Sequence, residues 1–401
     1  MKDHFLMIYA IPTLEAADHA VLGLINEQRE LLRFQVSQSP NRWQGFLRRN
    51  TFARALQGSN SIEGYNANLA EAVAIVDDER PETLEEETSK ALVGYRNAMT
   101  YVLQIHDDPH TVTDGQLIRS LHFMMMSYDL TKLPGQWRPG AVVVVHEPSG
   151  ETVYEGPEPQ LVPDLMGALV HQITAFDGVD PTVLGAMAHL NLAMIHPFRD
   201  GNGRMARALQ TLVLAKRGIT SPVFSSIEEW LGRNTEAYYA MLAQVGQGSW
   251  HPEHDALPWV RFCLTAHYQQ AATLMKRNAE VSRVWTEVER VRAGLGLPDR
   301  CEGPLMDAAF GYKVRNKRYR EDAEISDVVA SRDLKRLTEA GLLDAVGEKR
   351  GRYYQAAAGL AAITARGRDR TRAANPYDLV TQAEAARQLP LRFETSGRLD
   401  S

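Results

Sequence analysis

The chain has 401 residues, of which 44% are hydrophobic and 23% are charged, as in ordinary folded proteins. This composition excludes a disordered protein and a coiled-coil rod, and the length predicts two to three domains. The 44 Lys and Arg residues and 50 Asp and Glu residues give a net charge of −6, which excludes a global basic field for binding nucleic acid.

Neither a secretory signal nor a membrane span is expected. The apolar stretch over residues 5–11 is too short for a signal peptide and follows the acidic Asp3. No run of about 18 apolar residues occurs anywhere in the sequence. The two cysteines, Cys263 and Cys301, lack the spacing of a zinc site or a disulfide framework. We therefore expect a cytoplasmic protein.

Most of the first 290 residues have apolar side chains at helical spacing, behind residues that favour helix starts. The N-terminal region, residues 1–108, is expected to form helices from Leu14, from Asn41, and over 69–76 and 83–105. The next region, residues 109–250, is expected to add helices over 114–126, 162–176, 182–195 and 204–216. Residues 251–300 are expected to form connecting helices, so the predicted fold class is mainly α.

One stretch, residues 141–156, departs from this pattern. Its β-branched run Val142–Val145 is followed by turn residues and then by Thr152, Val153 and Tyr154, which predicts a β-hairpin. Taken alone, such a hairpin fits a structural edge as well as a functional flap.

A second, smaller α+β module is expected over residues 301–366. Basic residues gather over 313–320, and a helix is predicted over 325–341 with Arg332, Lys335 and Arg336 on its outer face. The remaining residues, 367–401, have no core pattern and are expected to form a loosely attached tail.

Residues 196–207, His-Pro-Phe-Arg-Asp-Gly-Asn-Gly-Arg-Met-Ala-Arg, carry the clearest chemical pattern. Gly201, Asn202 and Gly203 permit tight turns that aim backbone N–H groups at one point where a helix begins, which is a phosphate-binding arrangement. Arg204 and Arg207 lie three residues apart in the first turns of that helix and suit a polyphosphate.

Two further residues in this segment suit phosphoryl chemistry. Asp200 offers the hard oxygen that Mg²⁺ takes alongside phosphate oxygens and water. His196 can accept a proton near neutral pH, because the unperturbed pKa of histidine is about 6.5.

The segment resembles the Fic-domain family, whose signature H-P-F-x-[D/E]-G-N-[G/K]-R-x-x-R is matched in full. This resemblance implies a helical core that transfers AMP from Mg·ATP to a Ser, Thr or Tyr hydroxyl of a protein, itself included, and releases diphosphate. It implies that His196 is the base, Asp200 the metal ligand, residues 201–203 the anion hole, and Arg204 and Arg207 the phosphate clamps.

The same resemblance gives roles to residues outside the signature. The hairpin becomes a flap, with Val153 and Tyr154, that holds the backbone of the target protein by strand addition. Asn234, Tyr238 and Tyr239 resemble the lining of the family's adenine pocket, although amide and aromatic residues at helical spacing are equally typical of a core.

Residues 59–64, Ser-Asn-Ser-Ile-Glu-Gly, match the family's inhibitory motif [S/T]-x-x-x-E-[G/N]. Ser59 and Glu63 share one face of a helix, and a carboxylate that reaches Arg207 would occupy the guanidinium meant for a phosphate. The sequence therefore predicts a self-inhibited enzyme.

Residues 301–366 resemble a winged helix-turn-helix domain, with Arg332, Lys335 and Arg336 as candidate DNA contacts. Homodimerisation and target presentation are equally consistent with such a module. Two alternatives to the transferase stay open: removal of AMP or transfer of another nucleotide or phosphate-containing group, and a DNA-binding regulator whose Fic core senses nucleotide.

Overall fold

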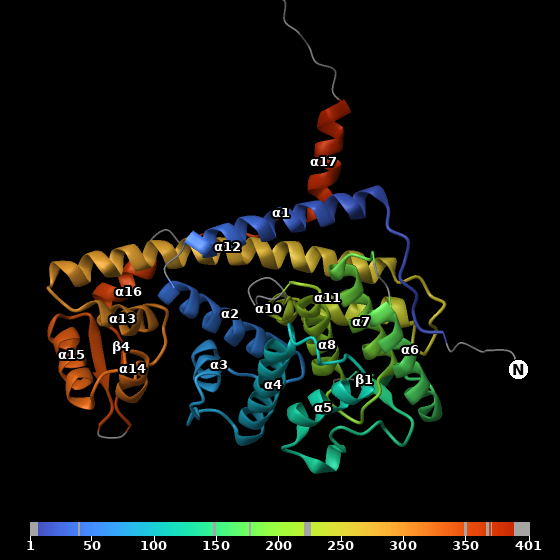
Figure 1. Ribbon diagram of the computed structural model, residues 1–401, viewed down its shortest axis with the longest axis horizontal. Helices are drawn as coiled ribbons and strands as arrows, with labels where there is room; N and C mark the ends of the chain where they lie inside the picture. The colour runs from blue at the N-terminus through green and yellow to red at the C-terminus, as the bar shows by residue number, and fades with distance from the viewer. Residues whose placement is uncertain are drawn as a thin grey trace, which may run out of the picture.

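The structure, a computed structural model, describes residues 7–388 except for 39–40, 147–149, 176–177, 220–225, 349–350, 366–368 and 370. It is mainly helical, as predicted (Figure 1). The N-terminal half contains helices α1 (Ala16–Gln38), α2 (Asn41–Ile62), α3 (Leu69–Val76), α4 (Glu86–Ile105), α5 (Gly115–Met126), α6 (Val162–Ala175), α7 (Pro181–Ile195) and α8 (Asn202–Lys216). The C-terminal half contains α10 (Glu228–Arg233), α11 (Thr235–Gly246), α12 (Leu257–Gly294), α13 (Glu302–Ala309), α14 (Asn316–Asp322), α15 (Asp327–Glu339), α16 (Ala358–Ala365) and α17 (Pro376–Gln388).

The long helix α12 organises the molecule. α1 lies along it, the helices of the central region pack near its N-terminal half, and α13 to α16 gather at its C-terminal end (Figure 1). One apolar core unites α4, α5, α6, α7 and α8. Because both α7 and α8 are buried almost all round, the loop between them is held by packed helices on either side.

The predicted hairpin is present as strands β1 (Val143–His146) and β2 (Glu151–Glu155), paired antiparallel with an irregularity between Val144 and Val145. Its expected turn residues, 147–149, lie outside the described residues. The hydroxyl of Tyr154 donates to the carbonyl of Met194 at 2.8 Å, which fastens the hairpin to α7.

The C-terminal module has the predicted order of helices followed by an antiparallel pair, β3 (Leu343–Val346) and β4 (Tyr353–Ala356). Ser326 caps α15 by accepting the N–H of Val329. The core of this module includes Phe46 and Leu47 of α2 and Trp285 of α12. The module therefore does not close on a core of its own, and a separate winged-helix domain is not established.

Two contacts join distant segments. α2 crosses α10 at Gly58 and Gly232, where a Cβ on either glycine would overlap the backbone of the other helix. The stretch expected to be a loose tail contains α17, whose Tyr377 donates to Asp18 of α1 and whose Val380 is buried. Residues 381–386 are exposed and the start of α17 makes the contacts with the protein, so this helix has no periodic apolar pattern in the sequence. No helix within the described ranges is long and apolar enough to cross a membrane.

Candidate active site

The loop between α7 and α8 adopts a left-handed conformation at both ends. His196 has φ 51° and ends α7, and Gly201 has φ 75° and precedes α8. Phe198 is fully buried between them. The side-chain amide of Asn202 accepts from the N–H of Phe198 and donates to its carbonyl, each at 2.9 Å. Asn202, expected to bind nucleotide, therefore uses its side chain to close the loop and leaves only its backbone N–H for an anion.

The His196 ring is oriented by a carbonyl. Its Nδ1–H donates to the carbonyl oxygen of Ala193 at 3.1 Å, so the neutral ring carries its lone pair on Nε2. Burial lowers the pKa of His196 below the usual 6.5. The ring is therefore neutral at neutral pH, in the tautomer that a general base requires.

His122 contacts the loop between α7 and α8 from helix α5. No role for this residue is predicted from the sequence. Its Nδ1 accepts the N–H of Gly135 at 2.9 Å, so its Nε2–H donates to the carbonyl of Asp200, also at 2.9 Å. The ring stacks on Phe198 at 3.7 Å, and burial lowers its pKa to about 4. His122 is therefore a neutral positioning residue.

Arg138 is a second positioning residue without an assigned role in the sequence analysis. Its guanidinium donates to the carbonyls of His196, Gly140 and Pro157. Because these carbonyls lie on the loop and at both ends of the hairpin, one buried side chain fixes the hairpin beside the histidine. Such distant partners leave no local pattern in the sequence.

Arg204 is a buried cation that forms no ion pair within the described ranges. Only 1% of the residue is exposed, and no carboxylate pairs with it in the described part of the chain. Its guanidinium lies 5.0 Å from the ring centroid of Tyr65 and 3.1 Å from Sδ of Met126. Its Nε has no hydrogen-bond partner among the described residues. A buried guanidinium with such weak partners can gain strong hydrogen bonds and charge compensation by binding an anion.

Arg207, by contrast, is engaged by the segment predicted to be inhibitory. Its Nε donates to Oγ of Ser59 at 2.8 Å, and its Nη2 donates to the Ser59 carbonyl at 2.9 Å and to Oε1 of Glu63 at 2.6 Å. The same Glu63 oxygen lies against Gly203, where a Cβ would overlap it. The Glu63 carboxylate thus lies over the first turn of α8, where anions are favoured.

Asp200 lies at the edge of the loop with both carboxylate oxygens in use. Oδ1 accepts the N–H of Gly201 at 2.6 Å, and Oδ2 pairs with Nζ of Lys132 at 3.0 Å. The bond to Asp200 raises the pKa of Lys132. One carboxylate beside a helix N-terminus, where phosphate groups are favoured, fits Mg²⁺, which commonly uses one or two carboxylates together with substrate phosphates.

The residues expected around adenine differ in accessibility. Nδ2 of Asn234 donates to the Trp230 carbonyl, and its Oδ1 accepts from Arg372. Tyr238 is 1% exposed and shares a hydrogen bond with Nε2 of His189, which makes it part of the core. Tyr239 is 46% exposed and donates to the carbonyl of Ile62. Of the three, Tyr239 has the accessible ring.

The two expected hairpin contacts face opposite ways. Tyr154 points inward, whereas Val153 is exposed, as are Val143 and Val145 on the paired strand. In the C-terminal module, Arg332, Lys335 and Arg336 are all exposed on α15, as predicted from helical spacing. Lys335 pairs with Glu339 on the same helix.

Comparison with known proteins agrees with this geometry. Residues 112–214 match the model of the Fic/DOC family, and this segment contains the hairpin, α7 and the loop with His196. The chain is 27% identical over 259 residues to "Protein adenylyltransferase Fic" from Nematostella vectensis. The aligned region covers 63% of this chain and 55% of that protein. It is 37% identical over 84 residues to "Protein adenylyltransferase fic-1" from Caenorhabditis elegans, covering 21% of this chain and 14% of that protein.

Solved structures give the same fold. A Fic family protein from Desulfovibrio desulfuricans G20 superposes with a TM-score of 0.55 at 22% identity, covering 87% of this chain and 98% of that chain. Fic-1 from C. elegans gives a TM-score of 0.52 at 20% identity, covering 65% and 72%. The present chain spans about half the length of the Nematostella relative. Over residues 112–214 the chain is therefore similar to the Fic/DOC family, and the relatives named above are protein adenylyltransferases.

Proposed function

We propose that this protein is a self-inhibited adenylyltransferase that moves AMP from Mg·ATP to a Ser, Thr or Tyr hydroxyl of a protein, with residues 109–250 as its catalytic core. The observation that carries this proposal is the buried Arg204 guanidinium, which has no carboxylate partner among the described residues and lies in the first turn of the helix that follows the His196 loop. This pairing of an anion site with a base suits transfer of a phosphoryl-type group.

In the proposed reaction, Arg204, Arg207 and the backbone N–H groups of residues 201–203 hold the phosphates. Nε2 of His196 accepts the proton of the target hydroxyl while the hydroxyl oxygen bonds to the α-phosphorus of ATP. The bond from that phosphorus to the bridging oxygen breaks, and the electron pair leaves with diphosphate. Mg²⁺, held by Asp200, would neutralise charge on the phosphates.

Self-inhibition is proposed from the Arg207 contacts. While Ser59 and Glu63 occupy this guanidinium, a γ-phosphate must compete with a carboxylate at 2.6 Å and is repelled by its charge. ATP then binds with its phosphates displaced from the position that His196 requires. Removing the Glu63 side chain should end both the competition for Arg207 and the repulsion of the γ-phosphate.

Target binding is proposed at the hairpin. The exposed Val143, Val145 and Val153 give β1 and β2 an apolar surface, and Arg138 holds the base of the hairpin beside His196. An extended segment of the target that pairs with a hairpin strand would bring its hydroxyl to Nε2. On the nucleotide side, Tyr239 is the proposed ring against adenine.

The test is intact mass spectrometry of the full chain with Mg·ATP, comparing wild type, Glu63→Gly, and Glu63→Gly combined with His196→Ala. We expect Glu63→Gly alone to gain the mass of AMP. If no variant gains mass while added candidate targets also stay unmodified, the transferase proposal fails.

The two alternatives have their own readouts in the same series. Loss of AMP from pre-modified protein, dependent on Glu63, would identify a deAMPylase. Binding of DNA that weakens on Arg332→Ala and Lys335→Ala, measured across a salt series, would identify a regulator instead.

A further inference from the structure

The helix that carries the inhibitory motif is anchored at its other end in the C-terminal module. The last turn of α2 brings Ser59 to Arg207, and Glu63 follows directly. The first half of α2 contributes Phe46 and Leu47 to the apolar core of the module. A single helix therefore connects the proposed active site to a module that lies at the far end of α12 (Figure 1).

Aromatic packing fixes this distant end. The ring centroid of Phe46 lies 5.1 Å from that of Phe310, 6.1 Å from that of Tyr312 and 6.4 Å from that of Trp285. Nδ2 of Asn50, one turn further along α2, donates to the hydroxyl of Tyr312. Movement of the module would therefore carry the first half of α2 with it.

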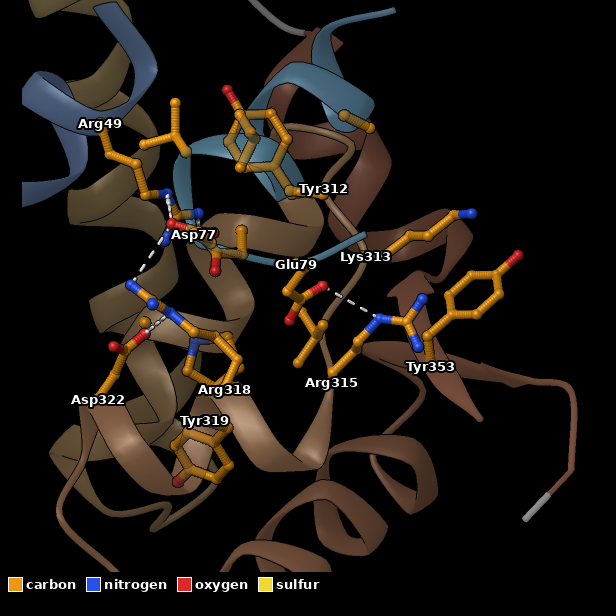
Figure 2. A pocket seen from close by; sticks show the side chains of 18 of the residues that line it. Arg49, Asp77, Glu79, Tyr312, Lys313, Arg315, Arg318, Tyr319, Asp322 and Tyr353 are labelled. Carbon is orange, nitrogen blue, oxygen red and sulfur yellow. Dashed lines mark hydrogen bonds and ion pairs between the residues drawn. The ribbon is translucent and has the colours of Figure 1, made fainter. Parts of the chain in front are cut away.

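Ion pairs cross the same junction. Arg49 of α2 pairs with Asp307 of α13 at 2.5 Å, and its Nε lies 3.7 Å from Asp77, which follows α3. Arg315 and Arg318 of the module pair with Glu79 and Asp77 at 3.2 and 3.5 Å (Figure 2). Burial raises the pKa of Asp307 to about 6 despite Arg49, so this carboxylate depends on its arginine partner.

On its charged side, the junction is not closely packed. A cavity of about 970 Å³ lies between α2, the segment after α3, and the module, and it is lined by the charged residues of these ion pairs (Figure 2). A joint that is held by side-chain pairs around open space can change its arrangement at a lower cost than a filled apolar core.

We propose that the C-terminal module regulates the active site through α2, because the Arg49–Asp307 pair and the packing of Phe46 hold this helix where Glu63 engages Arg207. This inference rests on the proposed inhibitory role of Glu63. A change in these contacts therefore changes how often Glu63 leaves Arg207.

The first test follows α2 without requiring catalysis. Amide hydrogen exchange of residues 57–64 is measured in the full chain for Arg49→Met and for the matched control Arg48→Met, whose side chain is exposed on the same helix. We expect exchange to rise at least about fivefold in Arg49→Met, as for a coupling of ordinary size, and to stay unchanged in Arg48→Met. Equal exchange in the two variants would overturn the proposal.

The second test uses AMP transfer. Arg49→Met should raise the rate at least about fivefold in the wild-type background and leave it unchanged in Glu63→Gly, where no carboxylate remains to be released. A similar effect in both backgrounds contradicts coupling through Glu63. If Glu63→Gly itself transfers no AMP, the proposed function fails, whereas the exchange result still decides whether the module holds α2.

A milder variant distinguishes loss of coupling from misfolding. Tyr312→Phe removes only the hydroxyl that accepts from Asn50 and preserves the ring against Phe46. It should change the exchange of residues 57–64 in the same direction as Arg49→Met, by a smaller factor. No change in a folded Tyr312→Phe, together with no change in Arg49→Met, overturns the coupling.

Discussion

Nζ of Lys132 lies 3.0 Å from Oδ2 of Asp200, so the proposed metal ligand already has a cation beside it. Lys132 comes from the short helix Leu130–Lys132, and both partners are partly exposed. A partly exposed pair of this kind contributes up to about 1 kcal/mol, so a divalent ion held by ATP can replace the ammonium.

We therefore expect Lys132→Met in the Glu63→Gly background to lower the Mg²⁺ concentration required for half-maximal AMP transfer, by roughly two- to fivefold. Calorimetry of Mg·ATP binding gives a second readout. Lys90→Met, which removes an exposed lysine on α4, serves as the control. A higher Mg²⁺ requirement would mean that Lys132 assists the metal rather than competing with it.

The buried state of His196 predicts the pH dependence of transfer. Burial lowers the pKa of His196 below 6.5, and only the neutral ring can accept the hydroxyl proton. Activity of Glu63→Gly should therefore persist as the pH falls to 6.5 and decline below it. The kcat/KM profile for the protein substrate checks this expectation, and an acid limb above 6.5 contradicts it.

His122 should matter for both stability and rate although it contacts no substrate in the proposed reaction. His122→Phe preserves a flat ring against Phe198 but leaves the Gly135 N–H and the Asp200 carbonyl without their partners. Each unsatisfied buried group costs about 1–3 kcal/mol. We expect a lower melting temperature and a lower kcat with little change in nucleotide binding. His171→Ala, at an exposed position on α6, should change neither quantity.

Glu229 predicts an acid-sensitive contribution to stability. Burial would raise its pKa, but Arg277, Arg233 and Arg54 lower it from 4.5 to about 2. The stabilisation is therefore present above pH 4.5 and is lost as the pH falls toward 2. Glu229→Gln should reduce the free energy of unfolding by about 3 kcal/mol at neutral pH, because three arginines lose their countercharge.

Urea denaturation near pH 7 and near pH 3 measures this difference between wild type and Glu229→Gln. The gap between the two proteins should narrow at the lower pH. A gap that stays constant would mean that Glu229 acts through packing and hydrogen bonds alone.

Local patterns made much of this protein predictable from sequence. Apolar spacing and capping residues identified the helices around the site, and the β-branched run before residue 146 identified the hairpin. The proposed base, metal ligand and phosphate clamps are predictable because they share one short segment, which the family signature specifies.

The remaining parts depend on contacts between distant residues. His122, Lys132 and Arg138 reach the loop from 58 to 78 positions away, and each is an unremarkable residue in its own segment. Nor could composition show that Phe46 packs into the C-terminal module, because an apolar helical residue fits any core. Tertiary contact, rather than periodicity, decides such positions.

If α2 tilts about its crossing with α10 at Gly58 and Gly232, the position of this crossing sets how far each end of α2 moves relative to the other. Counting 1.5 Å per residue, Glu63 lies about 7.5 Å beyond this pivot and Arg49 about 13.5 Å before it. A tilt about the pivot that displaces Arg49 by about 2 Å thus moves Glu63 by about 1 Å in the opposite direction. Since the Glu63–Arg207 contact is 2.6 Å long, a movement of about 1 Å directed away from Arg207 would take it past hydrogen-bond distance. A shift of about 2 Å where α2 meets the C-terminal module is therefore enough to alter the contact at the proposed active site.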